Sequence, residues 1–123
     1  MPDPNCTPGS IMSNATLDMI CRTGYSSTVR DVSNKLKEEV YQTYGIYNRT
    51  PYQYQIDHLV SLQLGGSNNK DNLWPMETNF KQKNKDPVEN CLRKWVCSGK
   101  ITLQEAQKGI ATNWTIFISK CNI

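Results

Sequence analysis

The only histidine of the sequence, His58, directly follows an acidic residue, Asp57, and this pair is the strongest chemical signal in the chain. A neutral imidazole, with an unperturbed pKa of about 6.5, can accept a proton from water at physiological pH. A carboxylate is the hard oxygen ligand that Mg²⁺ prefers. One general base and one divalent cation together suffice to hydrolyse a phosphodiester bond. The pair therefore predicts a hydrolytic site that uses Mg²⁺, or Mn²⁺ or another divalent cation.

The cation would need a second oxygen ligand, and the chain after the pair must supply it. Asn79, Asn84 and Glu89 are the candidates, and their residue types alone do not decide among them.

A β-hairpin is the element that would position the pair. Apolar and polar residues alternate over 52–57, which predicts a strand with Asp57 at its end. A short apolar segment at 59–64 leads into a turn rich in Gly, Ser and Asn at 65–69. Leu73 and Trp74 then predict a brief return strand, which Pro75 should end.

The helix after the hairpin has clear boundary signals. Asp86 is a good N-cap, Pro87 is favoured at the first helical position, and Glu89 would complete a capping box. An apolar stripe that includes Trp95 continues to Gly99, which should end this helix.

Two further helices flank this region. Helical spacing of apolar residues predicts one helix over 32–44, ended by Gly45. A second begins after a capping box formed by Thr102 and Glu105 and buries Trp114. The predicted fold class is α+β, a small hairpin packed among three helices in one domain of 123 residues.

Five cysteines in so short a chain indicate disulfides rather than a metal site. No CxxC pair occurs and one histidine cannot complete a Cys/His site, so structural zinc is not expected. Four cysteines can pair in three ways, and the sequence alone does not fix the pairing. The preferred bridge joins Cys21 to Cys97, where closing so long a loop would contribute about 4 kcal/mol.

The first 29 residues are rich in Pro, Ser, Thr, Asn and Gly, and they predict an extended arm held by cysteines. Met1 runs directly into polar residues, as expected for a start codon placed on a trimmed, exported chain. No run approaches the ~18 apolar residues that would span a bilayer. We therefore expect a secreted or periplasmic protein that does not insert into membranes.

Positive charge is concentrated after the hairpin. Residues 76–100 carry six basic and three acidic residues, whereas the remainder carries eight of each. A polyanion such as nucleic acid suits this segment, because phosphate neutralisation supplies most non-specific affinity. An ordinary solvated helix face is the alternative interpretation. The residues expected to contact phosphates are Lys81, Lys83, Lys85 and Arg93. No obligate protein partner is indicated.

The order of these motifs resembles the ββα-metal fingerprint of HNH endonucleases. More narrowly, nearly the whole chain is similar to a group of small, exported bacterial HNH-like proteins. The motifs that carry the resemblance are Asp57-His58, Leu64-Gly65-Gly66-Ser67, Asn72-Leu73-Trp74-Pro75, Thr7-Pro8-Gly9, Ile20-Cys21, Gly24-Tyr25, Val29-Arg30, Lys85-Asp86 with Glu89-Asn90, Val96-Cys97-Ser98-Gly99 and Ile110-Ala111-Thr112-Asn113-Trp114.

The resemblance implies a ββα-metal core over 53–98 with additional helices around it. It makes His58 the general base, Asp57 a metal ligand, and Asn72 a residue that hydrogen-bonds across the loop and holds the Asp-His strand. The chain departs from the family at the helix-side ligand. A strict alignment places Lys81 or Lys83 where relatives often carry a ligand Asn or a nearby His. Asn79 is the favoured replacement ligand and Asn84 the second.

The resulting hypothesis is an exported endonuclease of little sequence specificity that cuts DNA, or RNA, and leaves 5′-phosphate ends. Two other hypotheses compete with it. The chain could be a nucleic-acid-binding module that keeps the frame without turnover. It could instead be a disulfide-stapled secreted structural or interaction protein, in which the Asp-His pair is an ordinary strand-end contact.

Overall fold

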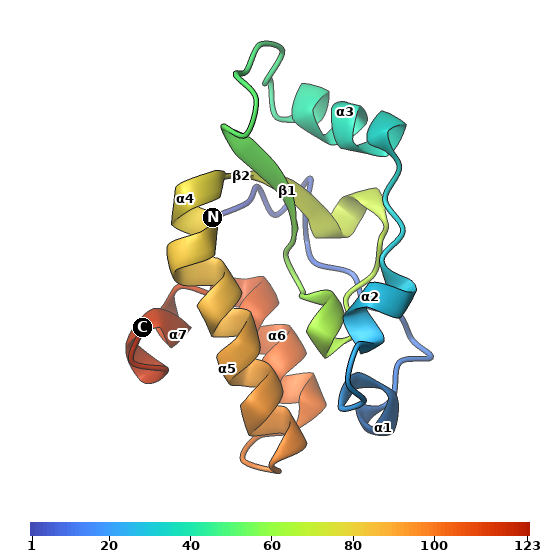
Figure 1. Cartoon of the computed structure of the whole chain (residues 1–123), viewed down its shortest axis with the longest axis vertical. Helices are drawn as coiled ribbons and strands as arrows, with labels where there is room; N and C mark the ends of the chain where they lie inside the picture. The colour runs from blue at the N-terminus through green and yellow to red at the C-terminus, as the bar shows by residue number, and fades with distance from the viewer.

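An antiparallel hairpin of β1 (Tyr54–His58) and β2 (Leu73–Glu77) forms the one sheet of the computed structural model, which describes residues 1–123 (Figure 1). The register pairs Asp57 with Trp74 and His58 with Leu73. Between the strands lie two single 3₁₀ turns, η1 (Leu62–Leu64) and η2 (Lys70–Asn72). The α+β class expected from the sequence is confirmed, while the more specific ββα-metal assignment stays a proposal.

Both strand boundaries differ from those predicted. β1 begins at Tyr54 rather than near Tyr52, because Tyr52 has a left-handed backbone (φ 65°) and points into solvent. β2 continues through Pro75 to Glu77, opposite Ile56 and Tyr54. A proline is tolerated there because, in a sheet of two strands, each strand has a free edge on which a missing N–H costs no ladder bond.

The helix after the hairpin begins nine residues earlier than predicted, at Thr78 rather than Pro87. α4 (Thr78–Phe80), η3 (Lys81–Lys85) and α5 (Asp86–Cys97) follow one another without a break. Asp86 is therefore inside the helical run and not its N-cap, and the predicted capping box with Glu89 is wrong. η3 is a wider, π-type turn, in which the backbone N–H of Asp86 donates to the carbonyl of Lys81. This widening accommodates Pro87, which can donate no hydrogen bond to the preceding turn.

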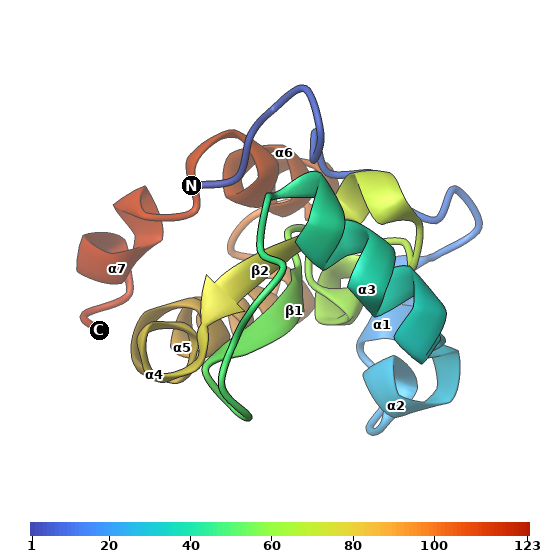
Figure 2. The ribbon, with the colours of Figure 1, turned by 90° about the horizontal axis from the view of Figure 1, so that it is seen from above.

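The remaining helices enclose the hairpin from two sides. α3 (Asn34–Thr43) lies across the hairpin on the side away from α5 and α6 (Figures 1 and 2). Gly45 follows α3 with a left-handed backbone (φ 72°), as expected for a helix stop. α6 (Leu103–Asn113) begins at the predicted capping box of Thr102 and Glu105, which is confirmed. A short α7 (Ile116–Lys120) ends the chain.

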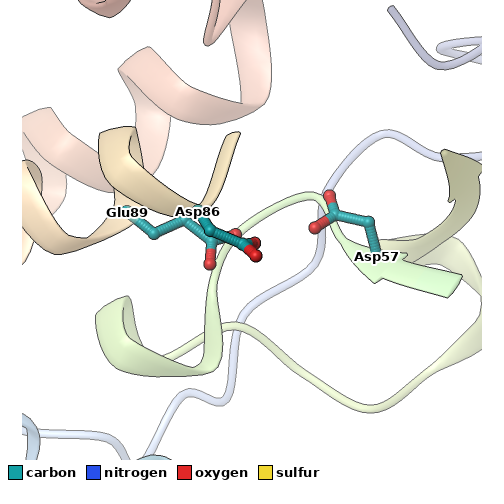
Figure 3. A group of neighbouring side chains, drawn as sticks. All are labelled: Asp57, Asp86 and Glu89. Atoms are coloured by element: carbon teal, nitrogen blue, oxygen red, sulfur yellow. The ribbon is translucent and has the colours of Figure 1, made fainter. Parts of the chain in front are cut away.

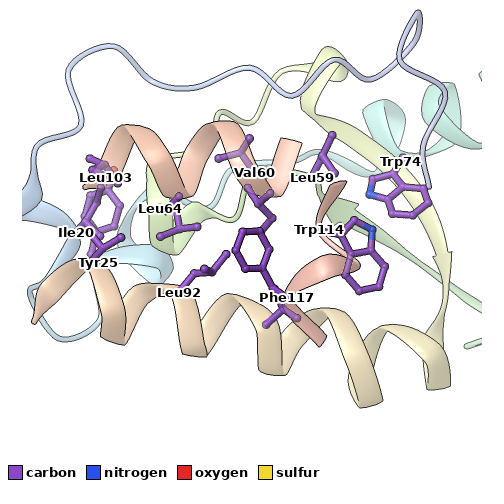
Figure 4. Packing of buried hydrophobic residues seen from close by; sticks show 14 of the residues in the cluster. Ile20, Tyr25, Leu59, Val60, Leu64, Trp74, Leu92, Leu103, Trp114 and Phe117 are labelled. Carbon is purple, nitrogen blue, oxygen red and sulfur yellow. The ribbon is translucent and has the colours of Figure 1, made fainter. Parts of the chain in front are cut away.

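One hydrophobic core joins these elements. Side chains from α5, α6, α7 and the loop after β1 meet in the space shown in Figure 4. Trp114 belongs to this core and is 1% exposed, and the partly buried Trp95 packs against the core. Both tryptophans are therefore core residues, as the apolar stripes of their helices predicted. The core fixes α5 relative to the end of β1, and this relationship positions the candidate site.

The N-terminal arm is less extended than predicted. It contains two short helices, α1 (Leu17–Ile20) and α2 (Tyr25–Val29). α1 forms because Thr16 caps it, with its side chain accepting a hydrogen bond from the backbone of Met19.

Two disulfides hold the fold together. Cys21–Cys97 ties the arm to the end of α5, which confirms the preferred bridge, and Cys91–Cys121 ties α5 to the C-terminal segment. Cys6 is free. These bridges indicate a non-reducing compartment. None of the helices has both the length and the apolar character needed to cross a membrane.

Candidate active site

Asp57 and His58 are the last two residues of β1, and Lys85 of the helix contacts the carboxylate of Asp57 and the backbone carbonyl of His58. Asp57 is 2% exposed and His58 is 7% exposed. Trp74, opposite Asp57 in the register, donates from its indole Nε1 to Asp57 Oδ2 at 2.9 Å. Figure 3 shows the carboxylates of Asp86 and Glu89 pointing from the helix toward that of Asp57. The carboxylate of Asp57 therefore faces the helix, whereas the ring of His58 meets Asn68 of the loop, and both residues line one small polar cavity.

Asn72 fixes the loop that returns from β1 to β2. Its side chain is fully buried, donates to the carbonyls of Val60 (3.0 Å) and Ser67 (2.8 Å), and accepts from the backbone of Val60 (2.8 Å). Gly66 is part of this loop, and an added Cβ there would be 1.7 Å from the carbonyl oxygen of Val60. These contacts give Asn72 the positioning role across the loop that the resemblance implied.

His58 is held in one orientation by Asn68. Its Nε2 lies 3.0 Å from Asn68 Oδ1, and the amide nitrogen of Asn68 donates to the carbonyl of Val29 at 2.7 Å. Since the amide oxygen can only accept, the neutral ring carries its proton on Nε2 and leaves the lone pair on Nδ1. Burial lowers the pKa of His58, an effect that the Asn68 hydrogen bond opposes and that nearby Arg30 reinforces. The ring is therefore a neutral base at physiological pH.

Lys85 is fully buried and its ammonium group is surrounded by oxygen. Nζ lies 2.9 Å from Asp57 Oδ2 and 2.8 Å from Glu89 Oε2, and it donates to the carbonyls of His58 (3.1 Å) and Leu59 (3.0 Å). Burial alone would lower the pKa of Lys85, but the two carboxylates outweigh it and raise the pKa above its usual value. Lys85 is thus a permanent positive charge inside the site.

The pKa of Glu89 is raised by its buried position in this group. Burial, with the nearby Asp57 carboxylate, raises the pKa of Glu89 to about 6, against the opposing effect of Lys85. Asp57 and Glu89 share one lysine, so the buried group retains an excess of negative charge.

A second lysine, Lys81, lies one turn earlier and contacts Asp57 and a third carboxylate, that of Asp86. Lys81 Nζ lies 2.6 Å from Asp86 Oδ1 and 3.8 Å from Asp57 Oδ1. Lys83 is exposed on the helix surface. Of the two lysines that alignment placed at the family's ligand position, Lys81 is therefore the one that faces Asp57.

The metal that the resemblance implies can be tested against this donor set. Oxygen atoms of Asp57, Asp86 and Glu89 lie within 4.8 Å of one another, and carboxylates suit Mg²⁺. However, the ammonium groups of Lys81 and Lys85 already bind all three carboxylates. A divalent cation would have to displace Lys81 from Asp86 and lie beside the charge of Lys85. The residues as arranged do not fit a resident Mg²⁺.

The other residues expected at the site lie elsewhere. Asn79 lines a surface hollow beside Tyr54 and Glu77, and the amide of Asn84 donates back to the carbonyl of Phe80. The structure brings neither to Asp57. Arg93 points to the arm, where it donates to the carbonyls of Ile20 (3.3 Å) and Arg22 (3.4 Å).

A small polar cavity of about 40 Å³ opens at the pair. Its lining includes Arg30, which follows α2 and is exposed, and Lys81 from the helix. The full lining is Arg30, Ile56, Asp57, His58, Ser61, Leu62, Lys81 and Glu89. The cavity has room for ordered water, but not for a nucleotide.

The sequence assigned no site role to Asn68. It predicted Asp86 as a helix N-cap and Lys85 as a phosphate contact, and it singled out Arg30 only as part of a motif. One signal was available, because Lys85 and Glu89 are four residues apart and such pairs meet on a helix surface.

Comparison of the chain with protein-family models, with curated proteins and with solved structures gives no match. Membership of the HNH superfamily is therefore a proposal, which depends on the motifs and the site geometry alone.

Proposed function

We propose that the chain is a nuclease of the ββα type, which hydrolyses phosphodiester bonds with His58 as general base. One observation carries the proposal: an imidazole with its free lone pair on Nδ1 lines the same small polar cavity as Arg30 and Lys81. A base, a water-sized space and two cations are the parts that attack on a phosphate diester requires. DNA is the first substrate to test, and RNA the second.

The cavity dimensions support one arrangement of the reacting groups. Because the cavity has room for water but not for a nucleotide, we infer that the attacking water lies inside it and the scissile phosphate at its mouth, beside the exposed Arg30. Water would attack phosphorus as its proton passes to Nδ1 of His58. The P–O3′ bond breaks, the 3′ oxygen takes a proton from solvent, and the products are a 3′-hydroxyl and a 5′-phosphate. Arg30 and Lys81 balance the charge that develops on the phosphate oxygens.

Positive charge in this mechanism comes from side chains. Lys81 and Lys85 occupy the carboxylates that would otherwise hold a cation. No step in the proposed reaction therefore depends on Mg²⁺, and the test must include a chelator.

The test is cleavage of supercoiled plasmid and of a labelled single strand, with Mg²⁺, with Mn²⁺ and with EDTA. We expect nicking that persists in EDTA and falls at least about 100-fold in His58→Ala. Asn69→Ala, an exposed neighbour of Asn68, is the matched control. Equal cleavage by His58→Ala and wild type would remove His58 from the mechanism.

A second candidate is a nucleic-acid-binding module without turnover. The observation that favours it is the burial of His58 together with the contacts that Lys81 and Lys85 make to Asp57, Asp86 and Glu89. Salt-sensitive retention of DNA without cleavage in any of the divalent ions, or in EDTA, would select this function over the first.

A further inference from the structure

A second, larger cavity lies between the N-terminal arm and α5. Its volume is about 360 Å³, within the range of small-ligand sites. Three cationic side chains line it, Arg22 from the arm and Arg93 and Lys94 from α5. No carboxylate is among its lining residues, and only Ile20 and Tyr25 are hydrophobic. A hollow with this lining favours an anion over an apolar ligand.

A disulfide and two hydrogen bonds hold the two walls of this cavity together without a ligand. The Cys21–Cys97 bridge joins the arm, next to Arg22, to the last turn of α5. Arg93 adds two hydrogen bonds from α5 to arm carbonyls, at 3.3 and 3.4 Å. A binding site whose walls are already ordered loses little conformational freedom when a ligand binds. Arg22 and Lys94 are exposed, and no ion pair engages either of them.

The segment that contains η1 and the helix α5 both contribute to this cavity and to the cavity at His58. η1 and the residue before it give Ser61 and Leu62 to the small cavity, and Gln63 to the large one. α5 gives Glu89 to the small cavity and Asn90 to the large one. A hydrogen bond of 3.1 Å from Gln63 to Asn90 joins these two elements in the lining of the large cavity. The two cavities are therefore neighbours on one face, with Glu89 and Arg93 separated by about 6 Å along the axis of α5.

We propose that the cavity of Arg22, Arg93 and Lys94 is a phosphate subsite, which holds a single nucleic-acid strand beside the phosphate at His58. This inference rests on the proposed function and adds the part of the substrate bound next to the cleaved bond. A polyphosphate strand fits better than a small anion, because the cations of the two cavities follow one another along one face. Backbone contacts of this kind carry no base information, so sequence preference is not expected.

The experiment uses Arg22→Gln/Lys94→Gln, which removes two cations that have no structural partner. The matched control is Lys37→Gln/Lys108→Gln, which removes two exposed cations from α3 and α6. The probe is a fluorescein-labelled, 12-nucleotide single-stranded DNA, measured by anisotropy over a salt series. We expect the site variant to bind about tenfold more weakly at low salt. Its slope of log K against log salt should fall by about 1.4, since each single-strand phosphate contact contributes about 0.7.

The control should bind like wild type within about twofold. An equal loss of affinity in both double variants would overturn the subsite. Arg93 is left intact because its bonds to the arm would confound the result. Thermal unfolding of both double variants confirms that neither loses its fold.

Cleavage assays separate this inference from the proposed function. If wild type binds the strand through Arg22 and Lys94 but never cuts it, the subsite stands and the nuclease fails. If wild type cuts and the site variant keeps both its KM and its salt slope, the nuclease stands and the subsite fails.

Discussion

His58 and Asn68 share a hydrogen bond of 3.0 Å, and this bond determines which imidazole nitrogen can act as a base. Asn68 is itself anchored, because its amide nitrogen donates to the carbonyl of Val29. Asn68 thus links the N-terminal arm, at Val29, to the imidazole ring of His58. A base whose tautomer is fixed by a neutral acceptor differs from one paired with a carboxylate, since the neutral partner raises its pKa less.

The pKa of His58 should lie below its usual value, because burial outweighs the Asn68 hydrogen bond. Since this is the only histidine, NMR titration of its ring resonances reports the value directly. The unfolded chain binds the proton at about pH 6.5 and the folded chain only at lower pH. Between these values the unfolded state holds more protons, so His58 should make the fold less stable as pH falls through this window. A titration midpoint at or above 6.5 would contradict the assignment.

Asn68→Asp should raise the pKa of His58 above that of the wild-type ring, because it places a carboxylate against the Nε2 proton. Asn69→Asp adds the same charge one residue further along, where the side chain is exposed. The two variants are compared by the same ring titration. Equal shifts would mean that general electrostatics, rather than the Asn68 contact, set the pKa.

Lys85→Met should destabilise the fold by about 3–5 kcal/mol, because it leaves Asp57 and Glu89 buried without their cation. Lys83→Met, two residues away and exposed, should change the free energy of unfolding by less than about 0.5 kcal/mol. Urea denaturation measures both. A small loss in the Lys85 variant would show that this buried pairing is dispensable.

Lys81→Asn should create a divalent cation site. It removes the ammonium group that lies 2.6 Å from Asp86 and 3.8 Å from Asp57, and it places an amide oxygen donor in the same turn. We expect Mn²⁺, followed by electron paramagnetic resonance, to bind at least about tenfold more tightly than in wild type. Lys83→Asn is the control and should resemble wild type. If wild type itself binds Mn²⁺ as tightly as the Lys81 variant, the lysine does not block a cation.

Much of the framework could be predicted because local signals and tertiary structure agree. The Thr102–Glu105 capping box begins α6, and Gly45 ends α3. Alternation of apolar and polar residues predicts the strand that Asp57 and His58 end. These features depend on residues close in sequence, where single residue types restrict the backbone strongly. The hydrogen bonds of Asn72 across the loop from β1 to β2 were implied by the family resemblance and not by a local signal.

The start of the helix after the hairpin could not be predicted in the same way. Asp86 and Pro87 are typical of a helix start, yet a wide turn allows the same proline inside a helix. Lys81, Lys83 and Lys85 all lie in that turn. Lys81 and Lys85 face the strand while Lys83 faces solvent, and a count of charges along the sequence could not distinguish them.

The Cys21–Cys97 bridge is expected to support both stability and strand binding. By the chain-entropy relation, closing a loop of 76 residues contributes about 4 kcal/mol. Cys21→Ser/Cys97→Ser should therefore lower the free energy of unfolding by about that amount, whereas Cys6→Ser, which removes the free cysteine, should leave it nearly unchanged. Because the bridge also joins the two walls that carry Arg22 and Lys94, the double variant should bind the 12-nucleotide strand more weakly under conditions where it stays folded. Full affinity in the folded double variant would show that the arm keeps its place through Arg93 alone.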